Sequence, residues 1–551
     1  MKVRILFAAL AAALLSELSP EASACTNLIV GKKASKDGSV MVSYSADSHT
    51  LYGELYRYPA ADHARGTMRK IVEWDTNKYL GEIPEVAHTY SVIGNINEHQ
   101  VLIAETTWGG RKELHEPNGI MDYGSLIYIA LQRSKTAREA IKVITDLVEK
   151  YGYHSSGESF SIADKNEVWI LELIGKGKAE KGAVWAAIRI PEDAISGHAN
   201  QARIQQIPFK DKANCMYSKD VVSFARKMGY FEGKDKDFSF QAAYNPYDVT
   251  GLRGCEGRVY AFFNKFNREI KPYESFIKGE TTTPMPLYIK PDRQLSVADM
   301  RDMMRDHYEG TCFDMTQDVG AGPYKVPYRW RPMTYVVDGK EYINERAIAT
   351  QQTGWVIVGQ LRSELPDAIG GILWFGTDDA DMAVFTPIYC SVTEVPECYK
   401  HGNGDMATFS WTSSFWIHNW VANMAYNKYS YMIQDIRKVQ RELESSYDNE
   451  LVPKADKTAL ELLKQDPAKA TAFLNELCNK NSNAATARWK QLGEFLIVKY
   501  IDGNVKKEKD GRFELDENGF IPMPNQPGYN DTYYRNIVKE TGDHFLIGPA
   551  N

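Results

Sequence analysis

The sequence predicts an α+β fold, in which packed β-sheets carry helices on their outer faces and a mainly helical region follows. Two observations predict the sheets and their helices: short β-branched runs are separated by turn residues, and capped amphipathic segments interrupt those runs. A third predicts the last part, because apolar residues recur only at helical spacing from about Trp411 onward. Strands and helices in this mixture favour stacked layers around a shared core.

The composition is that of a globular protein with a large core. Of 551 residues, 43% are hydrophobic and 25% are charged, and the net charge is −7, which excludes a disordered chain. The acidic balance and the lack of a basic stripe argue against a nucleic-acid partner. Length permits more than one domain, and we expect a catalytic domain over residues 25–404 and a helical region over residues 405–551, packed on it.

The N-terminus has the pattern of a secretory signal peptide. Basic residues precede an unbroken apolar run that ends at Leu15, which is too short to span a bilayer. Ala22 and Ala24 then supply the small residues of a cleavage site. We therefore expect residues 1–24 to be removed and the protein to be exported, to the periplasm or the extracellular space.

Cleavage after Ala24 would make Cys25 the first residue, and two processing routes differ in what they leave there. A lipoprotein signal would leave a lipid on the sulfur and an acylated amine. Such signals usually carry a larger aliphatic residue where this chain has Ala22, and here a polar, proline-containing stretch separates the apolar run from the cysteine. Ordinary cleavage is favoured, and a lipid-anchored protein stays open as the alternative.

The seven cysteines do not form a metal or thioredoxin motif, because no CxxC pair occurs. Six of them could form up to three disulfides in an oxidising compartment, and buried free thiols are an equally acceptable reading in a chain of this size. The odd count leaves one thiol over, for which Cys25 is the natural candidate.

The predicted strands begin directly after Cys25. Leu28–Val30 and Val40–Val42 flank a turn signal at Lys36–Gly38 and so predict a hairpin. A cysteine at the start of a buried strand is held rigidly. Further strands are expected at Val92–Gly94, Gln100–Ile103, Ser159–Ile162 and Val168–Leu171.

Helices are predicted where caps precede apolar residues at helical spacing. Thr136 and Ser296 each begin a capping box. In the C-terminal region, Asp466 and Pro467 are typical of an N-cap and a first helical position, and residues around Trp489 indicate another helix. The earlier periodic apolar residues are Ile417, Val421, Met424, Met432, Ile436, Val439 and Leu443.

An N-terminal cysteine carries a nucleophile and a base in one residue. The thiol has a reference pKa of about 8.5 and the α-amine one of about 8, so the neutral amine can take the thiol proton without a histidine. The thiolate then attacks an amide carbonyl and forms a thioester, which water hydrolyses. The site also needs an acid to orient the amine and donors for the oxyanion.

Several blocks resemble one known family. The start of the mature chain and five later blocks are similar in order to the family C69 dipeptidases, which are N-terminal-nucleophile (Ntn) hydrolases related to penicillin V acylase and bile salt hydrolase. The resemblance extends to about Tyr399 and implies an αββα sandwich with cysteine dipeptidase activity. The blocks are Cys25–Ser39, Gly157–Asp164, Glu167–Glu172, Ser196–Ile204, His307–Thr311 and Gln360–Arg362.

The resemblance implies four catalytic positions. Cys25 matches the nucleophile, and Asp47 matches the aspartate that holds the new amine in related acylases. Asn200 falls where those enzymes place an oxyanion-side asparagine, and Arg258 resembles an arginine near the nucleophilic sulfur. Without the family, Asp47 would be a turn or cap residue, Asn200 a loop residue and Arg258 an ion-pair arginine.

The chain departs from the related acylases at two positions. Tyr44 stands where they carry an arginine, and Thr107 stands where they carry a second oxyanion asparagine. We expect Thr107 to contact substrate instead, together with the acidic residues Glu105 and Glu158, which suit the free amine of a dipeptide.

Other sequence motifs give weaker evidence of a catalytic or binding site. His198 could be a catalytic base, but the mechanism needs none, so a structural role is favoured. Val319–Pro323 lacks the end of a phosphate loop, there is no His-Glu-x-x-His, and His49 beside Asp47 is a weak metal signal. We therefore expect no metal and no cofactor.

The leading function is an exported cysteine dipeptidase acting on dipeptides or short peptides. An amidase for other N-acyl amides on the same scaffold is the first alternative. A lipid-anchored binding protein, in which Cys25 is only the anchor, is the second. We expect no membrane association unless the chain is lipidated, and a homo-oligomer is possible.

Overall fold

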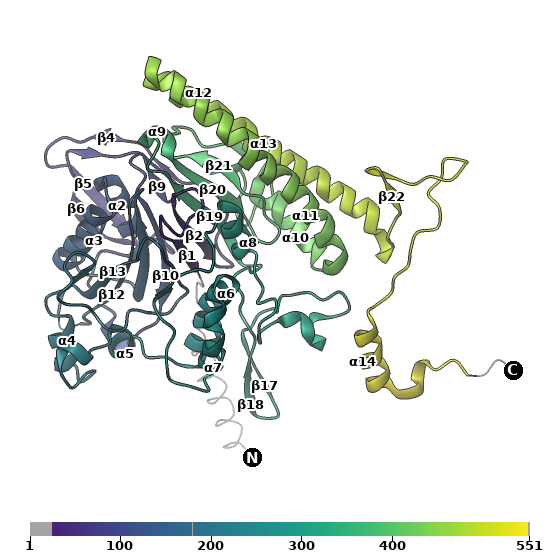
Figure 1. The fold of residues 1–551 in the computed structure, drawn as a ribbon, viewed down its shortest axis with the longest axis horizontal. Coiled ribbons are helices and arrows are strands. Elements are labelled where there is room, and N and C mark those ends of the chain that lie inside the picture. The colour runs from purple at the N-terminus through teal and green to yellow at the C-terminus, as the bar shows by residue number, and fades with distance from the viewer. Residues whose placement is uncertain (1–24, 179, 549–551) are drawn as a thin grey trace, which may run out of the picture.

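A computed structural model describes residues 25–178 and 180–548 (Figure 1). The predicted signal peptide lies outside the described residues. Two antiparallel sheets form the centre of the molecule, as the strand pattern predicted. Cys25 directly precedes the first strand of one of them.

The first sheet has seven strands in the order β16-β14-β1-β2-β19-β20-β21. The predicted hairpin is confirmed: β1 and β2 pair from Thr26 opposite Ser45 to Val30 opposite Met41. Both strands are buried along their whole length. The bounds are β1 (Thr26–Val30), β2 (Val40–Asp47), β14 (Ile195–His198), β16 (Tyr288–Ile289), β19 (Thr353–Leu361), β20 (Gly371–Thr377) and β21 (Thr386–Tyr389).

The second sheet has eight strands in the order β15-β13-β12-β11-β10-β9-β8-β3. It stacks on the first, since β10 packs against β1 and β2. The bounds are β3 (Arg57–Tyr58), β8 (Val92–Ile93), β9 (Ile96–Asn97), β10 (Leu102–Trp108), β11 (Gly157–Ala163), β12 (Val168–Gly175), β13 (Ala183–Arg189) and β15 (Cys215–Tyr217). The four further strands predicted from the sequence all belong to this sheet.

Helices cover the outer faces of both sheets. On the second sheet, α2 (Tyr123–Arg133) and α3 (Ala137–Tyr151) pack through apolar residues that form a core of their own. On the first, α6 (Gly257–Phe266) packs against β1 and β14, and α8 (Val297–Met304) packs against β2 and β19. Shorter helices are α4 (Val221–Lys227), α5 (Phe240–Tyr244), α7 (Glu274–Ile277) and α9 (Asp367–Gly370).

The predicted helix caps are present, with one difference. Ser296 and Asp299 form a reciprocal capping box at the start of α8. Thr136 accepts from the Glu139 backbone at the start of α3, but the Glu139 carboxylate bonds to the Lys135 N–H instead of returning to Thr136. That cap is therefore one-sided.

The C-terminal region is helical as predicted. It contains α10 (Ser414–Ala425), α11 (Tyr429–Ser446), α12 (Val452–Gln465) and α13 (Pro467–Tyr500). Asp466 caps α13 through the Ala468 N–H, as expected. The separate helix predicted around Trp489 is wrong, because α13 continues without a break through its polar middle.

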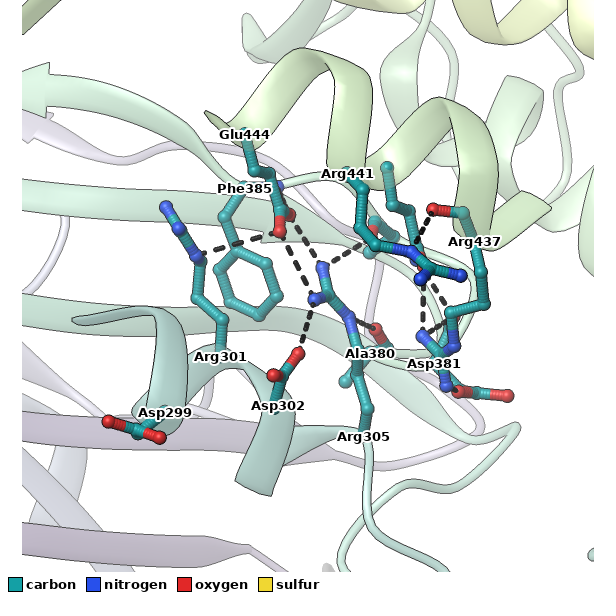
Figure 2. Close-up of polar contacts among 12 residues, drawn as sticks. Asp299, Arg301, Asp302, Arg305, Ala380, Asp381, Phe385, Arg437, Arg441 and Glu444 are labelled. Atoms are coloured by element: carbon teal, nitrogen blue, oxygen red, sulfur yellow. Dashed lines mark hydrogen bonds and ion pairs between the residues drawn. The ribbon is translucent and has the colours of Figure 1, made fainter. Parts of the chain in front are cut away.

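Buried ion pairs join this helical region to the sheets (Figure 2). The Arg305 guanidinium, just after α8, contacts the Glu444 carboxylate of α11 at 2.5 and 3.1 Å. It also donates to the carbonyls of Ala380 and Ala383, in the loop between β20 and β21. Burying both charges requires close pairing, so this contact fixes α11 to the body.

Beyond α13 the chain forms an arm that leaves the body (Figure 1). It contains β22 (Glu508–Lys509), β23 (Arg512–Phe513) and α14 (Asp531–Thr541), and none of its described residues after Tyr500 is buried. The remaining strands form hairpins: β4 (Ala61–Asp62) with β7 (His88–Thr89), β5 (Met68–Val72) with β6 (Tyr79–Pro84), and β17 (Thr334–Val337) with β18 (Lys340–Ile343).

All seven cysteines are free thiols, so the reading with buried thiols holds over the one with disulfides. Six are buried and Cys312 is exposed. In the described part of the chain, no helix combines the length and the apolar character that crossing a membrane requires.

Candidate active site

Cys25 lies at the start of β1 with its side chain turned toward the second sheet. It is 2% exposed. Its sulfur lies 3.3 Å from Glu105 Oε1 on β10, and 3.9 Å from the Tyr44 hydroxyl on β2. Tyr44 in turn donates to the same Glu105 oxygen at 2.6 Å. Three chain segments therefore converge on the thiol.

The surroundings of the thiol disfavour its charged form. Burial raises the pKa of Cys25 well above its ordinary value, and the charges of Glu105 and Asp47 raise it further. The backbone N–H of Asp47 partly opposes them. A thiol in this setting needs a base close by, and a positive amine on the same residue would offset the two carboxylates.

Asp47 ends β2 and is completely buried. Its carboxylate accepts hydrogen bonds from Thr353 at 2.6 Å and from Ser45 at 2.9 Å, and it forms an ion pair with Arg346. The Gln352 side chain donates to the Asp47 carbonyl at 3.2 Å. Asp47 is thus a strand residue with a fixed carboxylate, not a turn residue.

Arg258 connects the cysteine to the loop after β14. It lies in the first turn of α6, after a π-helical turn over Gly251–Glu256. One of its terminal nitrogens donates to the Cys25 carbonyl at 2.6 Å, and the other to Asn200 Oδ1 at 3.0 Å. Its hydrogen bonds reach the main chain of the cysteine, while the sequence reading placed it near the sulfur.

Asn200 adopts a left-handed backbone conformation, with φ of 58°. Asparagine tolerates this conformation better than most residues. Its side-chain nitrogen donates to the Thr107 carbonyl at 2.6 Å, while its oxygen accepts from Arg258. The amide therefore links β10 to α6 beside Cys25.

Glu105, Thr107 and Glu158 form one buried group on β10 and β11. Thr107 lies opposite Glu158 in the strand register and donates to it at 2.9 Å. Burial raises the pKa of both carboxyls, and the charge of Glu105 raises that of Glu158 still further. Burial therefore disfavours the charged form of each carboxyl.

His198 links the two sheets. Its ring nitrogens contact Thr106 Oγ1 at 2.7 Å and Ser161 Oγ at 2.8 Å. Burial lowers the pKa of His198 to about 3, so the ring stays neutral at physiological pH. These contacts support the structural role that the sequence favoured.

Tyr308, in the block His307–Thr311, bonds to Arg346, the arginine that forms an ion pair with Asp47. Tyr308 is buried in a left-handed conformation with φ of 68°, which is costly for a bulky residue. Its hydroxyl donates to the Arg346 carbonyl at 2.6 Å. A resemblance between sequences singled out this block, and the structure connects it to the site.

Sequence reasoning missed Arg346 and Thr353, which hold Asp47. It also missed Asp75, whose charge raises the pKa of Glu105, and Tyr123, which donates to Asp75 at 2.9 Å. None of these four lies in a recognisable motif. Tyr44 was visible only as a departure from the related acylases.

Residues 25–178 and 180–548 contain no cluster of three or more histidine, cysteine, aspartate or glutamate side chains that could hold a metal ion. His49 is therefore not part of such a cluster within these ranges.

Comparison with known proteins places this chain in a family. A sequence model of peptidase family C69 matches residues 24–442. The chain is 26% identical over 498 residues to a probable dipeptidase of Latilactobacillus sakei, covering 86% of this chain and 95% of that protein. It is 27% identical to a probable dipeptidase of Salmonella dublin, covering 66% and 81% of the two chains. It is 23% identical to dipeptidase A of Lactobacillus helveticus, covering 79% and 86%.

The range matched by the family model contains all six sequence blocks. The chain belongs to peptidase family C69, a family of cysteine-type peptidases.

Proposed function

We propose that this protein is an exported dipeptidase whose nucleophile is Cys25, made N-terminal by removal of residues 1–24. The observation that carries the proposal is the setting of the cysteine. Its thiol lies against Glu105, its carbonyl is held by Arg258, and the fixed Asp47 carboxylate lies on the neighbouring strand. No described histidine forms a hydrogen bond with the thiol, and the mechanism proposed here does not require one.

The α-amine of the mature cysteine supplies the base. Its reference pKa of about 8 lies close to that of a thiol, so the neutral amine can accept the thiol proton near neutral pH. Asp47 orients the amine and favours its protonated form, and this combination offsets the burial that otherwise keeps the thiol neutral. Glu105 faces the sulfur, so its negative charge has to be neutralised when the thiolate forms.

The substrate carries the charge that does this. The free ammonium of a dipeptide binds the Glu105–Glu158 pair, which brings a positive charge next to the sulfur. The thiolate then attacks the peptide carbonyl. The resemblance to related acylases is what assigns Asn200 an oxyanion role in this proposal, and its amide bonds to the Thr107 carbonyl and to Arg258 beside Cys25. The leaving amine collects the proton from the α-amine, and water hydrolyses the thioester.

The architecture supports the αββα sandwich of the Ntn hydrolases as the fold. Two stacked antiparallel sheets carry helices on both outer faces, and the nucleophile precedes the first strand of one sheet. The burial of Cys25 also argues against the lipid-anchor alternative, because a diacylglycerol on a 2% exposed sulfur would have to pass through the core.

The test compares one dipeptide with its N-acetyl form. We expect acetylation to lower kcat/KM by about 2–4 kcal/mol, the order for breaking a buried charge pair. Cys25→Ala is the control and should abolish hydrolysis of both. If the N-acetyl form is cleaved as well as the free dipeptide, the amidase alternative replaces the dipeptidase.

A further inference from the structure

Three arginines surround a single carboxylate on the main-chain side of Cys25. Arg258 and Arg346 are buried, and Arg331 is partly exposed. Asp47 is the carboxylate between them, and Arg346 alone forms an ion pair with it. The positive charges therefore exceed the negative ones on this side.

Arg331 is joined to the site through one residue. It lies just before β17, and its guanidinium donates to the side-chain oxygen of Gln352. The nitrogen of the same Gln352 side chain donates to the Asp47 carbonyl at 3.2 Å. This relay places the guanidinium next to the end of β2 and gives it a fixed direction.

Arg331 has no acidic partner in the part of the chain that the structure describes. The other two arginines are committed, Arg346 to Asp47 and Arg258 to carbonyl and amide oxygens around Cys25. Burial and the charge of Arg258 lower the pKa of Arg331, and the charge of Asp47 opposes them only in part. An anion that arrives from solvent would relieve this repulsion.

The charge on the two sides of the nucleophile is opposite. The sulfur faces Glu105, whose charge also acts on Glu158 of the neighbouring strand, while the Cys25 carbonyl faces Arg258. A free dipeptide has the same polarity, with an ammonium at one end and a carboxylate at the other. Two extended residues span at most about 7 Å, so both ends of such a substrate have to be bound close to the sulfur.

We infer that Arg331 binds the free α-carboxylate of the substrate and thereby restricts the enzyme to unblocked dipeptides. The inference rests on the proposed function and adds the residue that recognises the C-terminus. Arginine suits this task because its planar fork can bind both oxygens of a carboxylate. A longer peptide would lack a carboxylate at that position, so chain length would be selected by the same contact.

The test is a cycle of two enzymes and two substrates. Wild-type enzyme and Arg331→Met are assayed with one dipeptide and with its C-terminal amide. We expect the wild type to prefer the free acid by about thirty-fold or more in kcat/KM, the order for losing a buried charge contact. Arg331→Met should lose most of that preference, mainly through a higher KM for the free acid, while the amide changes far less.

A matched control is Arg57→Met. Arg57 is also partly exposed and forms no ion pair with a described residue, but it lies on the edge strand β3. This variant should keep the wild-type preference. Arg331→Lys keeps the charge without the fork and should give an intermediate preference; it also carries the test if the methionine variant does not fold.

Two results would overturn the inference. One is a wild-type enzyme that cleaves the acid and the amide equally well, and the other is an Arg331→Met or Arg331→Lys variant that keeps the full preference for the acid. In both cases the proposed function stands as long as Cys25→Ala is inactive. If Cys25→Ala retains activity, the proposed function itself fails.

Discussion

The replacement of Asp47 by asparagine tests both its ion pair with Arg346 and its proposed role in positioning the Cys25 amine. Asparagine has nearly the same shape but has no charge and only one acceptor oxygen. Thr353 can keep its hydrogen bond to that oxygen. Arg346 and Ser45, which now bond to the other oxygen, would then face an N–H group.

The magnitude follows from these contacts. Removing one partner of a buried ion pair costs about 3–5 kcal/mol, because the remaining charge stays buried without its counter-charge. We expect the free energy of unfolding of Asp47→Asn to fall by about this amount. We also expect kcat to fall at least roughly tenfold, since the amine of Cys25 loses the group that orients it.

The assay is steady-state hydrolysis of a dipeptide at a temperature well below the midpoint of thermal unfolding of the variant, with denaturant unfolding measured in parallel. Asp37→Asn is the control, since Asp37 lies in the turn of the same hairpin and accepts from Ser35 and Ser39 rather than from an arginine. That variant should keep the wild-type kcat. A wild-type kcat in folded Asp47→Asn would refute the role of Asp47 in positioning the amine.

Three other predictions follow from the site. Cys25→Ser should cut turnover severely, because a hydroxyl is far less acidic than a thiol, and undiminished hydrolysis would place the nucleophile elsewhere. Tyr308→Phe should lower kcat with little change in KM, because Arg346 loses a hydrogen bond that holds it in place. The control is Tyr244→Phe, which removes an equally buried hydroxyl bonded to the Val221 carbonyl at 2.6 Å and should leave kcat unchanged. Equal effects of the two substitutions on kcat would make Tyr308 merely structural. The pKa of His198 is about 3 in the folded protein and about 6.5 when unfolded, so its contribution to stability is complete above pH 6.5 and falls by about 1.4 kcal/mol per pH unit down to pH 3. The free energy of unfolding, measured against pH, should therefore have a shallower slope in His198→Gln than in the wild type. An unchanged slope would contradict this assignment.

The elements that the sequence predicts well are those with local signals. The hairpin after Cys25 has two β-branched runs around a turn, and both strands lie where the pattern placed them. The cap at Asp466 also has a local signal, and it begins α13 as expected. The separate helix predicted around Trp489 was wrong because the polar run Asn479–Asn483 looks like a loop in sequence. Asn479 and Asn483 instead lie within α13 and accept hydrogen bonds from the Glu397 and Cys398 backbone.

The contacts that shape the site come from pairs far apart in the chain. Glu105 lies 80 residues from Cys25, and Arg346 lies 299 residues from Asp47. No periodicity or turn signal relates such positions, because the register of two stacked sheets brings them together. Resemblance to a family singles out Cys25 and Asp47 as candidates, but it could not show that Tyr44 would connect the thiol to Glu105.

The measurement that tests the central claim most directly is the intact mass of the mature protein recovered from the exporting cell. We expect a chain that starts at Cys25 with an unmodified amine and thiol. A mass that includes acyl chains, or a mature chain that starts at another residue, would contradict it, because the amine of Cys25 could then not act as the base.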